Sequence, residues 1–299
     1  MSAPDRIAVV LVTYNRKAML LEALRGILGQ SLAIERIFLI DNASTDGTRE
    51  LLESAGYLSH ARIDYTQMPE NTGGAGGFHE GLRLAREAGF DWYWLLDDDV
   101  EPEQDCLEQL LSYRNISECI HPLVLYADGT AHEWEHIFDP ITTYQAGLHN
   151  LSFRNGKDWC VMQVACFEGM LVSDGVVAKV GLPEKDFFVY GDDGLFGFKA
   201  AFHTTVTYVS RARLNKKIKP GPAYYSPFKI YYDIRNRFLM RRKIAGLIYV
   251  PRYSRYLFIL FMFLLTIAYV RTNRSRQTFR AAFFAWKDGL GGVVGRQRY

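Results

Sequence analysis

The sequence predicts an α/β fold built on a doubly wound, mostly parallel sheet, followed by a helical C-terminal region. Over residues 7–112, apolar strand-like runs alternate with helix-like segments, and polar residues stand where the runs end. A long aromatic and basic stretch beyond Pro227 predicts the C-terminal helices. Alternation at short intervals is typical of parallel sheets, because each crossover helix packs back onto the sheet.

The first predicted strands are continuous apolar runs, and the segment between them has helical spacing. Ile7–Thr13 reads IAVVLVT, as expected for a parallel strand buried on both faces. Residues 17–29 place apolar side chains at the spacing of one helix face. The same alternation continues with a strand over Ile34–Ile40, a strand near Arg62–Gln67, a helix after Gly73–Gly77 and a strand over Trp92–Leu96.

Polar residues follow the second and fourth of these strands. The second strand leads into Asp41, and Ser44 or Thr45 is expected to cap the next helix with Asp46 in its first turn. The fourth runs directly into the triple aspartate Asp97–Asp99. Ligands of open α/β sheets bind beyond the carboxyl ends of the strands, so we expect these residues at the binding edge.

The triple aspartate is the candidate metal site. A carboxylate beside a buried strand must be hydrated, paired or bound to a metal. Mg²⁺ and Mn²⁺ prefer oxygen ligands, and a bound ion neutralises a diphosphate leaving group. In an extended chain Asp97 and Asp99 point to the same side and Asp98 points away. We therefore predict Asp97 and Asp99 as the metal ligands; the alternative is a solvated acidic turn or a helix cap.

The two parts of the chain differ in charge. Residues 1–210 hold 15 Lys and Arg against 31 Asp and Glu, whereas residues 211–299 hold 20 against 2. Such an excess of basic charge indicates an anionic partner, either a phospholipid surface or nucleic acid. The four cysteines form no C-x-x-C pair and no secretory leader is recognised, so we expect reduced thiols in a cytoplasmic protein.

One apolar segment bears on the choice of partner. Tyr256–Val270 is 15 uncharged residues between Arg255 and Arg271. A membrane-spanning helix needs ~20 residues. We expect a helix that lies in the interface of an anionic membrane. A buried core helix and a true span or hairpin are the alternatives.

Eight motifs follow one another along the chain: Val9–Asn15, Asp41–Gly47 (DNASTDG), Asn71–Phe78 (NTGGAGGF), Leu96–Val100, Phe167–Leu171, Gly181–Pro183, Phe188–Asp193 and Tyr232–Asn236. In this order they resemble family 2 glycosyltransferases of the GT-A fold, in particular the bacterial galactofuranosyltransferase and rhamnosyltransferase branch. The resemblance extends over about residues 7–243.

The resemblance implies an inverting transfer from a nucleotide-sugar donor without a covalent enzyme intermediate. Asp41 would contact the uracil or ribose, and the Asn71–Phe78 segment is expected to open a helix whose backbone approaches the donor or acceptor. The residues expected at the donor are Thr13, Asn15, Arg16, Asp41, Asn71, Gly74, Asp97 and Asp98. Asp97 and Asp99 would hold the Mn²⁺ or Mg²⁺ and the diphosphate.

The resemblance also assigns the acceptor side. Asp193 matches the general base that takes the proton of the attacking hydroxyl. Asp192 would bind acceptor hydroxyls or orient the base, and Phe167, Glu168 and Gly169 are also expected at the acceptor. Taken alone, Asp192 and Asp193 also fit an ordinary polar turn.

One departure concerns the third metal ligand. Members of this branch often carry a histidine some way after the base, but residues 211–217 contain none, and His203 lies earlier. Either Asn215 or water completes the metal shell, or Lys216 and Lys217 stabilise the diphosphate.

The segment His132–His136 fits the H-E-x-x-H pattern of zinc proteases. That chemistry needs both histidines one helical turn apart with a further ligand. A turn at Asp128–Gly129 precedes the segment and Pro140 follows it, so we expect surface or acceptor-side polar residues here.

We therefore predict a catalytic domain over residues 1–215 and a basic helical region over residues 216–299 at the cytoplasmic membrane face. The expected donor is UDP-galactofuranose, with dTDP-rhamnose as the alternative. The expected acceptor is a lipid-linked glycan of an O-antigen-like bacterial surface polysaccharide, with no nucleic acid partner. The competing class is a protein that binds nucleotide sugars or polyanions without turnover.

Overall fold

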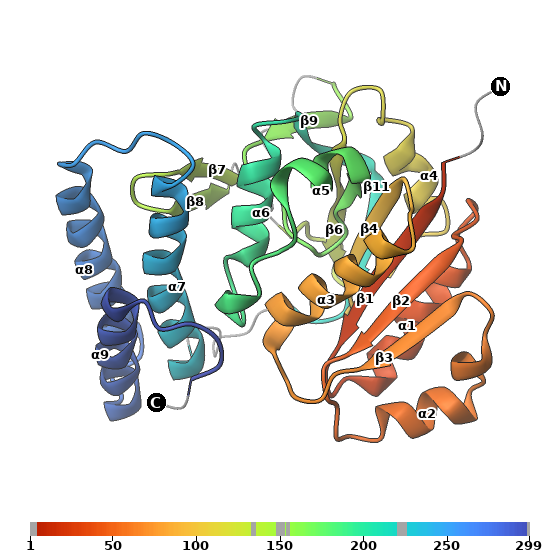
Figure 1. Ribbon diagram of the computed structural model, residues 1–299, viewed down its shortest axis with the longest axis horizontal. Coiled ribbons are helices and arrows are strands. Elements are labelled where there is room, and N and C mark those ends of the chain that lie inside the picture. Colours follow the sequence, from red (N-terminus) through yellow and green to blue (C-terminus); the bar gives the residue numbers. More distant parts are fainter. Residues whose placement is uncertain (1–4, 133–135, 148–152, 154–155, 220–225, 298–299) are drawn as a thin grey trace.

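The computed structural model describes residues 5–132, 136–147, 153, 156–219 and 226–297. Figure 1 shows a twisted sheet with its helices on one side of the molecule and three further helices standing together on the other side. These are α7 (Pro227–Ala245), α8 (Ser254–Thr272) and α9 (Arg276–Gly291). The predicted α/β fold with a helical C-terminal region is confirmed.

Four strands form the parallel half of the sheet, in the order β3-β2-β1-β4. They are β1 (Ile7–Thr13), β2 (Arg36–Asp41), β3 (Ile63–Gln67) and β4 (Trp92–Asp97). The helices between them are α1 (Lys17–Leu28), α2 (Thr48–Ser54) and α3 (Gly73–Glu87), with a 3₁₀ turn at Tyr57–Ser59. Each predicted strand lies within two residues of the observed one.

The other half of the sheet is mixed, and the sequence did not resolve it. β10 (Leu171–Ser173) runs antiparallel to β4 and to β6 (Cys119–Tyr126), and β11 (Val206–Lys216) runs parallel to β6. The remaining strands are β5 (Val100–Pro102) and β9 (Trp159–Met162), which pair with β11, and the hairpin β7 (His136–Asp139) with β8 (Tyr144–Gly147). The remaining helices are α4 (Cys106–Leu111), α5 (Asp174–Val180), α6 (Asp192–Ala200) and the 3₁₀ turn Lys185–Phe187.

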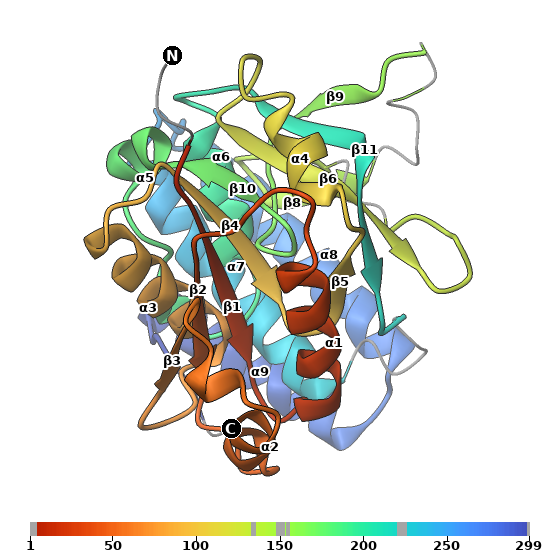
Figure 2. The ribbon, with the colours of Figure 1, turned by 90° about the vertical axis from the view of Figure 1, so that its right-hand side faces the viewer.

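Both faces of the sheet are covered, which explains why β1 is apolar throughout. Ile7, Val9 and Leu11 pack in one core layer with α1 and α4, while Ala8 and Val10 pack in the other with α3 and α5. Figure 2 shows α1 and α3 on opposite sides of the central strands. A strand buried on both faces has no polar alternation, so the run is continuous.

The glycines of α3 let the helix approach the sheet. A Cβ added at Gly77 would lie 2.6 Å from the Val12 side chain, and one at Gly81 would lie 2.4 Å from Val10. Gly77 and Gly81 therefore serve helix–sheet packing, whereas Gly73 and Gly74 stand in the first turn of α3.

Helix α2 begins without the side-chain cap that was expected from Ser44 or Thr45. The helix begins at Thr48 after Gly47, and no side chain caps it through Gly47. Asp46 instead accepts hydrogen bonds from the Thr48 backbone N–H (3.2 Å) and hydroxyl (2.5 Å). Ser44 and Thr45 bond to the loop after β1, so neither is the helix cap predicted from the sequence.

The apolar helix α8 is longer and more exposed than a core helix. It has 19 residues, and only 11% of its most apolar window is buried. By length and composition it is the one helix in the described part of the chain that could cross a membrane. The alternative of a buried core helix is therefore wrong.

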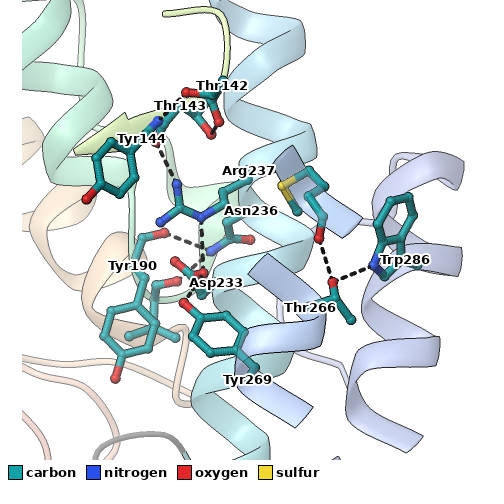
Figure 3. A network of polar contacts seen from close by, with 12 residues as sticks. Thr142, Thr143, Tyr144, Tyr190, Asp233, Asn236, Arg237, Thr266, Tyr269 and Trp286 are labelled. Atoms are coloured by element: carbon teal, nitrogen blue, oxygen red, sulfur yellow. Dashed lines mark hydrogen bonds and ion pairs between the residues drawn. The ribbon is translucent and has the colours of Figure 1, made fainter. Parts of the chain in front are cut away.

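A network of hydrogen bonds joins α7 and α8 to the β7–β8 hairpin (Figure 3). On α7, Arg237 Nε donates to Asp233 Oδ2 (3.0 Å), which also accepts from the Tyr269 hydroxyl on α8 (2.7 Å). Arg237 Nη1 donates to the carbonyl oxygen of Thr143 in the hairpin turn (2.6 Å). The helical region is thus joined to the part of the chain that carries the sheet.

Candidate active site

The carboxyl ends of β1, β2 and β4 meet at one edge of the sheet. In the parallel register Thr13 pairs with Asp41, and Val12 pairs with Asp97. The polar loops after these strands therefore lie together, at the edge where open sheets bind ligands.

Asp97, Asp99 and Glu168 form a carboxylate cluster at this edge. One oxygen of each lies within 4.8 Å of the others, and Asp99 and Glu168 are 6% and 4% exposed. Burial and the charges of Asp99 and Glu168 raise the pKa of Asp97 well above its ordinary value. Carboxylate oxygens at this spacing fit Mg²⁺ or Mn²⁺. The structure thus places Glu168 beside the expected metal ligands, although the sequence assigned it to the acceptor.

Two cationic or protonatable groups face Glu168. Lys216 Nζ, at the end of β11, forms an ion pair with Glu168 Oε1, and His132 Nδ1 lies 3.4 Å from Glu168 Oε2. Burial alone would raise the pKa of Glu168, but His132 and Lys216 hold it at about 2. The charge of Lys216 also acts on Asp99 and Asp97. The ammonium therefore partly neutralises the cluster.

Lys217 forms ion pairs with other residues, and Asn215 and His203 are exposed. The Lys217 ammonium pairs with Glu22 (2.8 Å) and Glu101. Asn215 is exposed on β11, and His203 is exposed in the turn after α6. Among the described His, Cys, Asp and Glu residues, Glu168 is the one that completes a group with Asp97 and Asp99.

Neither histidine of the H-E-x-x-H segment lies in a helix. The backbone N–H of His132 donates to Val124 O of β6 (2.8 Å), and His136 begins β7. Residues 133–135 lie outside the described part of the chain. His132 contributes to the environment of Glu168 instead.

Asp98 points to the end of β1 and fixes the loop that follows it. Its Oδ2 accepts from the Thr13 hydroxyl (2.7 Å) and the Tyr14 N–H (3.3 Å), and its Oδ1 lies 3.0 Å from Arg16 Nη1. The Arg16 guanidinium also lies 3.3 Å from Asp99 Oδ2. Thr13 and Arg16 thus bridge β1 to the triple aspartate.

Asn15 and Asp41 organise the loop after β2. Asn15 Oδ1 accepts from the Thr45 N–H (2.7 Å), and the Asn15 N–H donates to Ser44 Oγ (2.9 Å). The Asp41 carboxylate is fully buried and accepts from the Ser44 N–H (2.8 Å) and the Tyr65 hydroxyl (2.7 Å). Both residues sit at the binding edge with internal partners that hold the two loops together.

Amide side chains fix the first turn of α3. Asn71 Oδ1 accepts from the Gly73 N–H (2.8 Å), and Asn42 Oδ1 accepts from the Thr72 N–H (2.9 Å). At Gly74 an added Cβ would meet nothing within 4 Å. Gly74 therefore offers open backbone at the start of the helix, as a donor contact would require.

Asp192 and Asp193 begin α6 after the left-handed Gly191. Asp192 is 5% exposed, and burial raises its pKa well above the ordinary value, with the Asp193 charge adding to this. Burial also raises the pKa of Asp193 to about 6, and Glu168 adds to the rise. The Asp193 Oδ1 accepts from the Gly194 N–H (2.6 Å).

Phe167 and Gly169 have structural roles. The Phe167 ring is 3% exposed and packs against Phe78 and Phe196, with ring centroids 4.8 and 5.5 Å apart. Gly169 has φ +109°, and a Cβ there would lie 2.5 Å from Leu214. The Phe167 ring thus packs in the core and Gly169 is needed for close packing, while the expected place of both at the acceptor stays a prediction.

The mixed sheet with carboxylates gathered at its edge fits the glycosyltransferase that the sequence motifs predict. The chain belongs to glycosyl transferase family 2, whose model matches residues 8–172, more than half of the chain. Structural likeness extends to GT-A glycosyltransferases.

One relative is the galactofuranosyltransferase GlfT1 of Mycolicibacterium smegmatis, 27% identical over 202 residues. The match covers 64% of this chain and 64% of the relative, which is less than two thirds of the relative's length. The solved structures of S. aureus TarS 1–349 with UDP-GlcNAc and of the mannosyltransferase PcManGT from Pyrobaculum calidifontis with GDP-Man and Mn²⁺ share the fold. Their TM-scores are 0.59 and 0.58, at 14% and 16% identity, and the matches cover 96% and 97% of this chain and 81% and 76% of those chains.

Proposed function

We propose that this chain transfers galactofuranose from UDP-galactofuranose to a lipid-linked glycan of a bacterial surface polysaccharide, with inversion at the anomeric carbon. The observation that carries the proposal is the carboxylate cluster at the sheet edge. The charge of Glu168 in this cluster adds to the rise in the pKa of the Asp193 carboxyl. The relative named a galactofuranosyltransferase supports the choice of sugar.

The carboxylate cluster would hold Mn²⁺ or Mg²⁺ through Asp97, Asp99 and Glu168. When bound, the ion would neutralise the donor diphosphate. Lys216 supports the same task, because its ammonium already stands at the cluster. Thr13, Asn15, Arg16, Asp41, Asn71, Gly74 and Asp98 would bind or shape the donor side.

Asp193 would act as the general base on the acceptor hydroxyl, with Asp192 beside it. A base must accept a proton near the working pH, and a partly buried carboxyl with a pKa of about 6 fits that task better than an ordinary exposed one. Direct attack by the deprotonated hydroxyl, without a covalent enzyme intermediate, accounts for the inversion.

We further propose that residues 1–215 form the catalytic unit and that residues 216–299 dock on the anionic cytoplasmic face of the membrane. The only two acidic residues after 210 are bound inside the helical region: Asp233 to Arg237 and Tyr269, and Asp288 to the Tyr231 hydroxyl (2.6 Å). The exposed charge of this region is therefore basic, as an anionic lipid surface requires.

The exposed apolar surface of the region supports the same partner. Leu260, Phe263 and Leu264 on α8 and Phe279 and Phe283 on α9 are each more than half exposed. An open groove of about 790 Å³ between these helices is lined by Arg255, Tyr256, Ile259, Leu260, Phe263 and Trp286. An apolar face flanked by arginines is typical of helices that lie in a membrane interface. A lipid-linked acceptor would be presented at that surface.

The proposed function is tested by donor binding and donor hydrolysis across a panel of nucleotide sugars, with and without Mn²⁺. We expect a metal-dependent preference for UDP-galactofuranose. A preference for dTDP-rhamnose would keep the mechanism and replace the sugar. Binding without turnover of any donor would support the competing class of a non-catalytic binder and overturn the proposal.

A further inference from the structure

A strained backbone segment leads directly into the aspartates of α6. Between the 3₁₀ turn Lys185–Phe187 and α6, Phe188 and Tyr190 have φ of +67° and +65°, and Gly191 has φ of +91°. Residues other than glycine rarely adopt this conformation, which is strained and persists only where the surroundings impose it. The position of Asp193 therefore depends on whatever holds this segment.

Asn236 of α7 holds it through its backbone carbonyls. The Asn236 side chain is 2% exposed, and its Nδ2 lies 3.1, 2.6 and 2.8 Å from the carbonyl oxygens of Phe187, Val189 and Tyr190. Figure 3 shows Asn236 reaching from α7 to Tyr190. One amide thus restrains three of the four peptide groups before Gly191.

Arg235 orients that amide. Its Nε donates to Asn236 Oδ1 (2.6 Å), so the Asn236 NH₂ group must face the segment. Arg235 Nη2 donates to the same Phe187 carbonyl (2.7 Å), and Nη1 donates to the carbonyl oxygens of Val293 (3.3 Å) and Gly295 (2.9 Å).

Burial of the charged Arg235 guanidinium costs free energy that apolar packing does not offset. Arg235 is fully buried, and within the described part of the chain its hydrogen bonds go to uncharged amide and carbonyl oxygens. Burial lowers the pKa of its guanidinium. A buried charge without a counter-ion is costly, so its hydrogen bonds to carbonyls and its stacking near Tyr232 (4.9 Å) must compensate.

The opposite side of the segment contacts the donor-side helix. The Phe188 carbonyl accepts from the Ala75 N–H (3.2 Å), and a Cβ at Gly73 would lie 1.8 Å from the same oxygen. The segment is therefore wedged between the first turn of α3 and the Asn236 amide on α7. It links the donor edge, the catalytic aspartates and the helical region.

We propose that Asn236, oriented by Arg235, is a positioning residue for the general base: it fixes the strained segment that sets where Asp193 stands. The inference rests on the proposed function, in which Asp193 accepts the proton. It makes α7 part of the catalytic unit, although α7 lies beyond the predicted boundary at residue 215.

The test compares Asn236→Ala and the isosteric Asn236→Asp with Tyr269→Phe, a control that removes a partly buried hydrogen bond between α7 and α8. The activity is hydrolysis of UDP-galactofuranose with Mn²⁺. We expect kcat to fall about 100-fold in both Asn236 variants, because a displacement of about 1 Å has that effect, with donor Kd nearly unchanged. Tyr269→Phe should keep kcat within about threefold.

Two further measurements separate positioning from general destabilisation. Hydrogen exchange of the protein alone should lose protection over residues 187–195 in the Asn236 variants and not in Tyr269→Phe. In the Asp193→Asn background, Asn236→Ala should add little further loss of kcat, because both act through the same base. A full additional loss, or unchanged exchange, overturns the positioning role.

Failure of the two proposals can be told apart. Normal kcat in Asn236→Ala alongside an inactive Asp193→Asn overturns the positioning role and leaves the base in place. Normal kcat in Asp193→Asn overturns the base assignment and the catalytic part of this inference together. If Asn236→Ala does not fold, Asn236→Asp, which keeps the side-chain volume, decides the question.

Discussion

At the scale of single residues, the proposed role of Asp193 gives the most direct prediction. Asp193→Asn removes the proton acceptor and keeps nearly the same volume, so donor and metal binding should persist while turnover falls about 10²–10⁴-fold. Donor binding by calorimetry and turnover with UDP-galactofuranose check this. Asp64→Asn, at a partly exposed ion pair on β3, is the control. Near-normal turnover in Asp193→Asn contradicts the assignment.

The pH dependence follows from the burial of the same residue. Burial raises the pKa of Asp193 to about 6, and the base works only when ionised. The ionised fraction increases with pH, so kcat/KM should rise through about pH 6 and level off above pH 7. Below pH 5 it should drop about tenfold per pH unit. An acidic limb in the ordinary range of an exposed carboxyl, near pH 4, argues against a buried base.

Glu168 tests whether the third member of the cluster serves the metal or the acceptor. Glu168→Gln keeps the shape and removes a charged ligand, so the Kd of Mn²⁺ should rise at least about tenfold. Calorimetric titration of the protein with Mn²⁺ measures this without donor or acceptor. Glu80→Gln, on the surface of α3, should leave the Kd unchanged. Unchanged Mn²⁺ affinity in Glu168→Gln returns this residue to the acceptor side.

At the scale of secondary-structure elements, α3 offers a contrast between two glycines three residues apart. Gly77→Ala would place a Cβ 2.6 Å from the stiff side chain of Val12 and should lower the free energy of unfolding by about 1–3 kcal/mol. Gly74→Ala meets nothing within 4 Å and should leave stability unchanged or raise it by up to about 1 kcal/mol. Urea unfolding measures both; equal midpoints would disprove the packing role of Gly77.

The elements also show what the sequence could predict and what it could not. Strands such as β1 and β4 were predictable because both faces are buried, which makes each a continuous apolar run. β10 has three residues and β7 has four, too few for any periodicity to show. The place of Glu168 depends on β10 pairing with β4, a contact between distant segments, so its nearness to Asp97 was not visible in the sequence.

The residues of the candidate site also divide into those that the sequence could predict and those that it could not. Asp97, Asp99 and Asp193 stand out as charges after apolar runs or between glycines, and their positions relative to strand ends follow from parallel topology. Asn236 and Arg235 lie in the middle of a helix, where they have the appearance of surface residues. Their burial becomes visible only in the tertiary contact between α7 and residues 187–190.

At the scale of the whole molecule, the helical region is connected to the catalytic part more closely than an appendage would be. Arg237 of α7 bonds to the β7–β8 hairpin, and Asn236 bonds to the segment before α6. The carbonyls of Val293 and Gly295, near the C-terminal end, hold Arg235. The surface of α8 and α9 that we propose to dock on a membrane is thereby fixed relative to the proposed acceptor side of the active site.

This arrangement leads to a prediction about membrane binding. The chain should sediment with vesicles rich in phosphatidylglycerol and much less with pure phosphatidylcholine, because the exposed charge of residues 211–299 is basic. Phe283→Glu, on α9, should weaken binding at least about tenfold, since burial of an aromatic side chain contributes about 1.5–3 kcal/mol. Phe202→Glu, an exposed phenylalanine of the catalytic part at 53% against 66% for Phe283, is the matched control.

Salt distinguishes an interfacial helix from a spanning one. Molar salt shortens the screening length to about 3 Å and should release a protein held on the surface by arginines and shallow apolar contacts. Retention of the chain on vesicles after a molar-salt wash, with release only by detergent, would identify α8 as a spanning helix, which its 19 residues permit. Equal binding of the Phe202→Glu and Phe283→Glu variants would show that the membrane contact lies outside α9.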